Sequence, residues 1–150
     1  MEMTQKITEA QVNDEILNRF EINEKIKLPT SYRIFLINHN GGRPQKRKFS
    51  FIGKDGKEHN AAIHYFYALY DGEVGSLARA YRLFSDRLPL FHMPIARDAF
   101  GNLLVIPLRK VKDDSVYFWD HEQGDHNESS ECLQLVSKSF EAFVEGLIEG

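Results

Sequence analysis

Two uninterrupted apolar runs in the second half of the chain place the strongest limit on its fold. The runs are Leu103–Ile106 and Val116–Trp119, and each has the length and apolar character of a buried strand. The segment between them is largely polar and charged, so the two runs predict a hairpin with Lys110–Asp114 near its tip. The chain is therefore expected to contain a sheet with buried strands.

Helical patterns lie on both sides of this predicted hairpin. Each begins at a residue that can cap a helix and continues with apolar residues three or four positions apart. The expected helices are about residues 8–22 after the capping box Thr8-Glu-Ala-Gln11, a segment from Thr30 to the stop signal Asn40-Gly-Gly42, a segment after the cap Ser76, and a closing helix from the cap Ser139 through Ile148.

Shorter strand signals complete the pattern. They predict a strand at Phe49–Ile52, a turn at Asp55-Gly56, a return strand within Ala61–Phe66, a strand at Met93–Ala96 and a last strand at Cys132–Val136. Strands clustered between helices indicate an α+β fold. We expect a mostly antiparallel or mixed sheet flanked by two N-terminal helices, one inserted helix and a C-terminal helix.

Length and composition favour one domain over residues 1–150, with its core at about 8–148. Cys132 is the only cysteine, which excludes an internal disulfide framework and fits a reducing compartment. The sequence shows neither a signal peptide nor an apolar run long enough to span a membrane. These features predict a cytoplasmic protein.

Charge is distributed unevenly along the chain. From Asp113 to Glu131 there are seven acidic residues and no basic one, whereas Arg43–Lys48 is a basic run. The acidic stretch is either a surface that attracts a basic partner or a solvated loop. The basic run lacks interleaved aromatic residues and the whole chain is acidic, so we expect no direct binding of nucleic acid.

Candidate chemical groups gather after the second apolar run. Asp120, His121 and Glu122, with Asp125 and His126 following, contain the side chains that bind divalent metals or transfer protons. Neighbouring residues on a strand point to opposite faces, so these groups converge only if the loop folds back. An exposed strand end is the simpler interpretation, and no cofactor or catalytic residue is predicted.

Two further polar candidates have simpler structural interpretations. Asp98 and Asn102 bracket a turn, where such side chains bond to their own backbone but can also anchor a ligand or partner. Cys132 is surrounded in sequence by acidic residues, which disfavour a reactive thiolate. We interpret Cys132 as structural.

Four motifs in order resemble one known family. They are Leu28-Pro-Thr-Ser-Tyr32 with Asn40-Gly-Gly42, Pro94-Ile-Ala-Arg-Asp98 with Gly101-Asn102, Val116-Tyr-Phe-Trp-Asp-His-Glu122, and the closing Ser139-Phe140 helix. Together they resemble the SUKH superfamily, which includes fungal Smi/Knr cell-wall regulators and many bacterial immunity proteins. The resemblance covers nearly the whole chain and implies an α+β protein without catalysis.

The resemblance implies an immunity protein that binds and neutralises a cognate protein toxin, with a nuclease as one possibility. The alternative is a regulatory scaffold of the fungal type. The residues expected at the partner interface are Asp98, Asn102, Asp113, Asp114, Trp119, Asp120, His121, Glu122 and Asp125. An acidic inhibitor surface would suit a toxin that is basic where it holds phosphates. No membrane partner is expected, and no oligomeric state is predicted.

Overall fold

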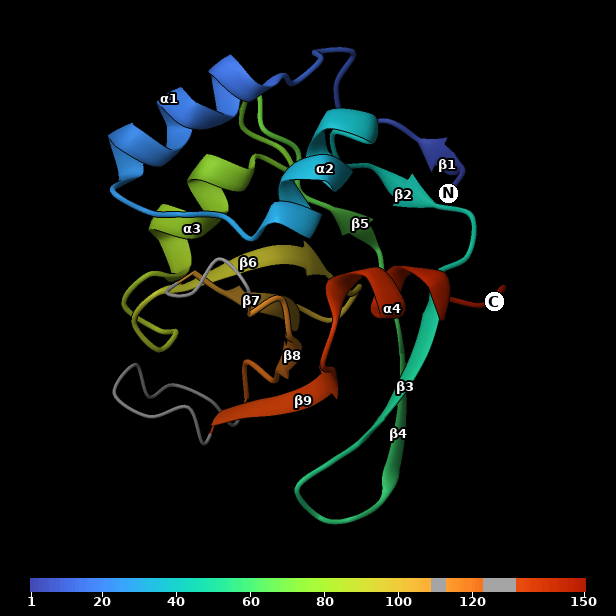
Figure 1. Ribbon diagram of the computed structural model, residues 1–150. Helices are drawn as coiled ribbons and strands as arrows, with labels where there is room; N and C mark the ends of the chain where they lie inside the picture. The colour runs from blue at the N-terminus through green and yellow to red at the C-terminus, as the bar shows by residue number, and fades with distance from the viewer. Residues whose placement is uncertain (109–112, 123–131) are drawn as a thin grey trace.

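A computed structural model describes residues 1–108, 113–122 and 132–150, and its centre is a five-stranded antiparallel sheet (Figure 1). The strand order is β5 (Tyr65–Phe66), β6 (His92–Arg97), β7 (Leu103–Pro107), β8 (Val116–Trp119) and β9 (Leu133–Ser137). The described elements confirm the α+β class and the antiparallel sheet that the sequence patterns predict.

The two apolar runs form the middle of this sheet. Every residue of β7 is buried, and β7 pairs with β8 in the register Leu103 opposite Trp119 and Val105 opposite Tyr117. The predicted hairpin is therefore confirmed. Residues 109–112, which include most of its predicted tip, lie outside the described part of the chain.

The described residues form four helices beside the strands: α1 (Asp14–Glu24), α2 (Thr30–Asn38), α3 (Leu77–Phe84) and α4 (Phe140–Glu145). Figure 1 shows α1, α2 and α3 on the same side of the five-stranded sheet. The sequence placed the starts of α2, α3 and α4 correctly, and the Ser76 and Ser139 hydroxyls accept hydrogen bonds from Arg79 N and Ala142 N.

The predicted start of the first helix is wrong. The Asn13 side chain caps α1 by accepting a hydrogen bond from Ile16 N at 2.9 Å. Thr8 Oγ1 instead accepts from Ala10 N, which closes a local turn several residues before the helix. The capping-box pattern pointed to Thr8, but a threonine hydroxyl can bond to nearby backbone without starting a helix.

The last helix is shorter than predicted. It ends at Glu145, and Gly146 N–H bonds back to the carbonyl of Ala142. Leu147 is still buried, but Ile148 is exposed and pairs with Lys48 as an antiparallel bridge. The apolar residues Leu147 and Ile148 that the sequence assigned to the helix belong to the segment after it, which pairs with Lys48.

A second hairpin lies beside the main sheet. It consists of β3 (Lys48–Ile52) and β4 (Glu58–Ala62) around the predicted turn at Asp55-Gly56. The expected return strand at Ala61–Phe66 was wrong in its bounds, because β4 begins at Glu58 and Tyr65–Phe66 joins the main sheet as β5. A short pair, β1 (Met3–Gln5) with β2 (Arg43–Pro44), lies near the N-terminus.

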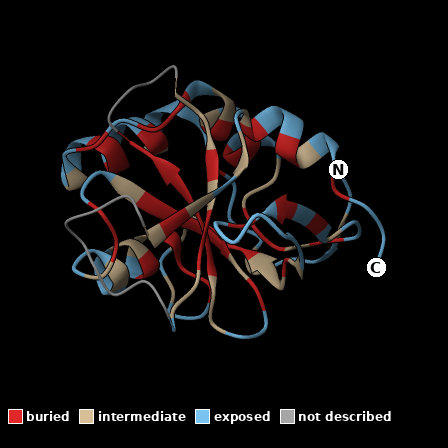
Figure 2. Cartoon of the chain, turned by 90° about the horizontal axis from the view of Figure 1, so that it is seen from below, coloured by how far each residue is buried: buried red, intermediate tan, exposed pale blue. Residues whose placement is uncertain are grey.

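The core fills the space between the helices, the sheet and the second hairpin. Figure 2 shows the buried residues on the strands and on the inward faces of the helices. Tyr32 and Phe35 of α2 pack edge-on against Phe140 of α4, and Phe51 of the hairpin packs 4.9 Å from Phe118 of β8, ring centroid to centroid. These contacts join α2, α4, the second hairpin and β8 into one core.

Candidate functional site

The turn between β6 and β7 is held by a buried carboxylate. Asp98 is 7% exposed, and its Oδ1 accepts hydrogen bonds from Phe100 N at 2.8 Å and Asn102 N at 2.9 Å. Its Oδ2 accepts from Asn102 Nδ2 at 2.9 Å. Asp98 thus bonds to its own turn, as its sequence position predicts, and these three donors compensate for the cost of burying a charge.

Asn102 links this turn to the end of β8. With Nδ2 donating to Asp98, the amide oxygen Oδ1 faces His121 and lies 3.2 Å from its N–H and 2.8 Å from its Nδ1. Because an amide oxygen only accepts, Nδ1 must carry a proton, and a neutral His121 then has its lone pair on Nε2. The carboxylate of Asp98 therefore orients His121 through Asn102.

The same turn presents an aromatic side chain to solvent. Phe100 is 79% exposed, although its backbone N–H is fixed by Asp98. Gly101 follows with φ +93°, a conformation that L side chains rarely adopt, and a Cβ there would lie 3.5 Å from the His121 ring. Phe100 is absent from the residues predicted from sequence. An aromatic residue inside an Asp-Ala-Phe-Gly-Asn turn is the signal that could have identified it.

Trp119 belongs to the core beneath this turn. It is fully buried, packs edge-on against Phe84 of α3, and is covered by the Arg87 guanidinium 4.8 Å from its ring centroid. Arg87 also donates to the carbonyl of His121 at 3.5 Å. The aromatic ring thus supports the segment that carries His121.

Asp120, His121 and Glu122 follow directly after Trp119. Asp120 and His121 are half-buried and Glu122 is exposed, and Asp120 Oδ1 accepts a hydrogen bond from Glu122 N at 2.9 Å. We call Phe100, Asp120, His121 and Glu122 the turn surface. It combines one exposed aromatic ring with two carboxylates on segments joined by the Asn102–His121 bonds.

Asp113 and Asp114 lie at the opposite end of β8 from the turn surface. Asp114 Oδ2 accepts from the Ser31 hydroxyl at the start of α2, and Asp113 Oδ1 accepts from the Ser115 hydroxyl. Five residues of largely extended chain lie between Asp114 and Asp120, so the two positions are roughly 20 Å apart. The described acids of the stretch from Asp113 therefore form two groups, and Asp125 lies outside the described residues.

The described part of the chain contains no group of three His, Cys, Asp or Glu side chains arranged to hold a metal ion. His126 and Asp125, which belong to the suspected cluster, lie outside that part. Burial raises the pKa of the Cys132 thiol, and a hydrogen bond from its own backbone and the charge of Lys54 only partly offset this effect. A thiol with a raised pKa is a poor nucleophile, in agreement with the structural interpretation of Cys132.

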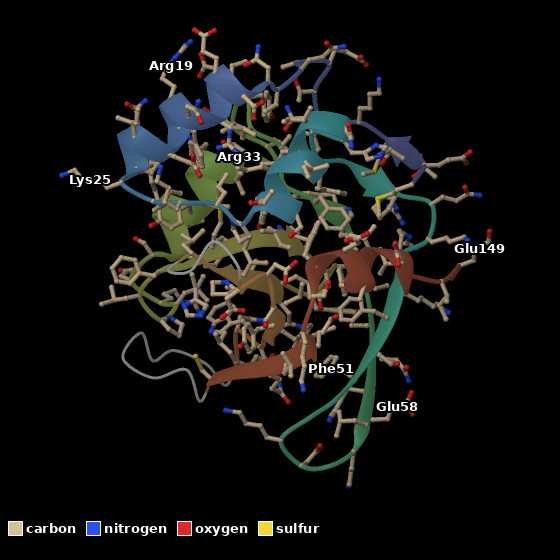
Figure 3. The ribbon with its side chains drawn as sticks, in the orientation of Figure 1. Arg19, Lys25, Arg33, Phe51, Glu58 and Glu149 are labelled. Atoms are coloured by element: carbon tan, nitrogen blue, oxygen red, sulfur yellow. The ribbon has the colours of Figure 1, made fainter. Side chains whose placement is uncertain are left out.

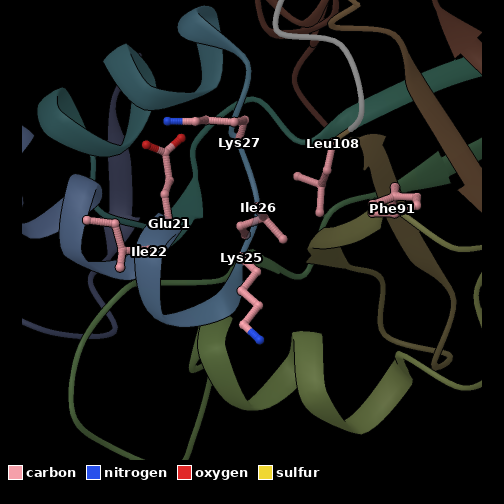
Figure 4. Close-up of a pocket in the computed structure, with 7 residues that line it drawn as sticks. All are labelled: Glu21, Ile22, Lys25, Ile26, Lys27, Phe91 and Leu108. Atoms are coloured by element: carbon pink, nitrogen blue, oxygen red, sulfur yellow. The ribbon is translucent and has the colours of Figure 1, made fainter.

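A separate cavity of about 380 Å³ lies between the end of α1 and the start of β6 (Figure 4). Its lining includes Phe91, which has φ +61° and is 45% exposed, and two lysines. Figure 4 shows Lys25 and Lys27 extending in different directions. Glu21 is bound to Arg33 at 2.7 Å and to Leu28 N at 2.7 Å. The charged groups around this cavity therefore do not converge on a common point.

No helix in the described ranges is both long and apolar enough to cross a membrane.

The chain is similar to the SPbeta prophage-derived uncharacterized protein YokK of Bacillus subtilis (strain 168). The two are 29% identical, and the match covers 91% of this chain and 74% of that relative.

The SMI1 / KNR4 family (SUKH-1) matches the chain from residue 11 to residue 146. This range includes every described helix and sheet strand of the central fold except the short N-terminal β1. It also includes the Asp98 turn and the segment through Glu122, whose residues carried the resemblance seen in the sequence. The chain belongs to the SMI1 / KNR4 family (SUKH-1).

Proposed function

We propose that this protein is a non-catalytic immunity protein that binds and neutralises a cognate protein toxin. The observation that carries the proposal is the SUKH-1 match over residues 11–146, since the superfamily includes many bacterial immunity proteins. The prophage origin in the name of the Bacillus relative supports a role in competition between bacteria. The fungal members are regulators, which makes a scaffold role the alternative.

The turn surface is the proposed contact region. Phe100 is a large exposed aromatic ring, and aromatic residues dominate the energetics of protein interfaces. Asp120 and Glu122 supply negative charge beside it, which complements the basic surface that a nuclease uses to hold phosphates. The proposed mechanism is occlusion of that basic surface.

The Asp98 network prepares this surface for binding. Asp98 fixes the N–H of Phe100, and Asn102 fixes the segment of His121 relative to the turn. A loop held in its bound conformation loses less conformational entropy when a partner binds. Asp98 and Asn102 thus act as positioning residues, while Phe100, Asp120 and Glu122 make the contacts.

The test is calorimetric titration of this protein against the toxin domain encoded beside its own gene, at low and high salt. We expect nanomolar affinity that weakens as salt rises. The double variant Asp120→Lys/Glu122→Lys should slow association about tenfold or more. Asp71→Lys/Glu73→Lys is the matched control, because these two exposed acids have the same spacing and lie on another loop.

Protection of cells that express the toxin tests neutralisation itself. Growth should be restored by the wild type and by His121→Ala, because the proposed contacts are made by Phe100, Asp120 and Glu122, and the loss of the imidazole should weaken a binder only modestly. If His121→Ala binds the toxin normally but loses protection, the protein acts as an enzyme. If the folded protein does not bind the toxin, the scaffold alternative is favoured, and its partner is then sought by pull-down from the native lysate.

A further inference from the structure

Strand β4 lies at an edge of the second hairpin. In the described part of the chain, β4 pairs with β3 only, and these two strands form a sheet of their own. Figure 1 shows their hairpin extending away from the helices, and Figure 3 shows Glu58 on its outer side and Phe51 on the side of the main sheet. One edge of β4 thus lies at the boundary of the molecule.

The hydrogen bonds at the two ends of the hairpin establish which groups face this edge. Ile63 N donates to Arg47 O, and Gly53 N donates to Lys57 O. Bonded and non-bonded pairs alternate in an antiparallel ladder, and β3 and β4 pair without a register shift. The N–H and C=O groups of Glu58, Asn60 and Ala62 therefore point away from β3.

The hydrogen bonds at the outer edge of β3 agree with this assignment of outward-pointing backbone groups. Lys48 is paired with Ala62, so its own N–H and C=O must point away from β4. They do, because Lys48 N donates to Ile148 O and Lys48 O accepts from Ile148 N, each at 3.0 Å. The same alternation therefore holds across both strands.

Strand β4 has few of the features that protect sheet edges from pairing. Its sequence, Glu-His-Asn-Ala-Ala, has no proline, lysine or glycine, and its pairing with β3 has no bulge. Glu58 is its only acidic residue, and the strand has no arginine. A regular edge of this kind is a template for one more antiparallel strand.

We propose that this edge binds the β4 edge of a second copy of the chain, with Asn60 opposite Asn60 on a two-fold axis. This register places Glu58 opposite Ala62 of the second copy and His59 opposite Ala61, so no like charges face each other. The outward groups of Glu58, Asn60 and Ala62 then form about six main-chain hydrogen bonds between the copies. The pairing is isologous, as a closed dimer requires.

Charge complementarity supports this occupant over an unrelated strand. Directly opposed residues share a face, so Lys48, Ala62 and Glu58 of the second copy would lie in one row across three strands. The outer two backbones would be about 10 Å apart, a distance that lysine and glutamate side chains can span over an alanine. Lys48, Glu58 and Ala62 already line a groove of about 740 Å³ on this face.

A single pair of five-residue strands buries less surface than a standard stable interface. The dimer is therefore expected to be weak, with a Kd of roughly 10–100 µM. It leaves the turn surface exposed, because that surface lies on the loops of the main sheet and not on the hairpin. Dimerisation and toxin binding are thus separate properties of the chain.

Sedimentation velocity of the protein from about 5 µM to 1 mM tests the proposal. The wild type should shift from monomer to dimer, and Asn60→Lys, which places two lysines opposite each other, should raise the Kd at least tenfold. Asn60→Pro should act similarly, because it removes an outward N–H without touching the ladder to β3. Asn23→Lys on the exposed side of α1 is the matched control and should leave the Kd within twofold.

Disulfide cross-linking tests the register independently of these variants. In a Cys132→Ala background, Asn60→Cys should form a dimer under mild oxidation, since opposed Cα atoms in a bonded pair lie about 5.5 Å apart. Asn23→Cys should remain monomeric. A wild type that stays monomeric at 1 mM overturns the proposal. So does a dimer that persists in Asn60→Lys while Asn60→Cys fails to cross-link.

Discussion

Two hairpin turns in this protein use the same local chemistry in different surroundings. In the β6–β7 turn, Asp98 accepts hydrogen bonds from backbone two and four residues ahead and is followed by Gly101 at φ +93°. In the β3–β4 turn, Asp55 accepts from Lys57 N and is followed by Gly56 at φ +77°. Each turn thus combines an aspartate that bonds forward with a glycine in the left-handed region.

The two turns differ in the side chains to which each aspartate is linked by hydrogen bonds. Asp98 is buried, and Asn102 extends its hydrogen bonds to His121 on the next strand of the sheet. The Asp55 side chain is 48% exposed, and its remaining bond goes to His59 of the same hairpin. An aspartate in a turn therefore acts locally unless burial and a second polar side chain connect it to another segment.

Asp98→Ala is expected to have the largest effect. It leaves the N–H groups of Phe100 and Asn102 and the Asn102 side-chain amide without their acceptor in a partly buried turn, and should lower the free energy of unfolding by about 3 kcal/mol. Urea denaturation measures this loss. A loss no greater than that of Asp55→Ala would refute the distinction between the two turns.

Asn102→Ala should have an intermediate effect. It removes the link between Asp98 and His121 but keeps the two backbone bonds to Asp98, so we expect a loss of about 1–2 kcal/mol in urea denaturation. The NMR signals of His121 should also change, since the ring loses the acceptor that fixes its tautomer. Unchanged ring signals would show that Asn102 does not orient His121.

Gly101→Ala and Gly56→Ala should cost similar amounts, about 1 kcal/mol each, because both glycines have a positive φ. A Cβ at Gly56 has no neighbour within 4 Å, and at Gly101 the nearest atom is an ordinary contact at 3.5 Å. Thermal denaturation compares the two. A much larger loss of stability for Gly101→Ala than for Gly56→Ala would contradict this expectation and would show that the β6–β7 turn cannot shift to accept the added Cβ.

Asp55→Ala should have the smallest effect, and the effect should depend on pH. The Lys57 N–H, and then His59, hold the pKa of Asp55 below its usual value. A carboxylate with a lowered folded pKa stabilises the protein above its unfolded pKa, and the contribution is lost as pH falls through the folded value. The stability difference between wild type and variant should therefore shrink between pH 5 and pH 2. A difference that grows on acidification would contradict the assignment.

The helices and strands that could be predicted from the sequence are those marked by residues within the element itself or directly beside it. Ser76 and Ser139 cap α3 and α4 because each hydroxyl bonds within its own first turn. The buried strands β7 and β8 follow from uninterrupted apolar runs. The prediction of Thr8 as the cap of α1 was wrong, because the Thr8 hydroxyl bonds to Ala10 N in a turn before the helix and Asn13 caps the helix instead.

The candidate site was only partly predictable for the same reason. The bonds of Asp98 to its own turn follow from the sequence, whereas its link through Asn102 to His121 depends on the pairing of β7 with β8. The exposure of Phe100 likewise depends on where the turn lies in the fold. The acidic stretch appears continuous in sequence, but β8 separates Asp113 and Asp114 from Asp120 and Glu122.

The proposed binding region for a toxin partner is the turn surface, which Asp98 holds in place. Amide hydrogen exchange of the protein, free and saturated with the neighbouring toxin domain, tests it most directly. We expect slower exchange on binding at residues 99–102 and 120–122 and unchanged exchange at residues 53–57. Protection confined to the β3–β4 turn, or absent from residues 99–102 and 120–122 in a saturated complex, would contradict it.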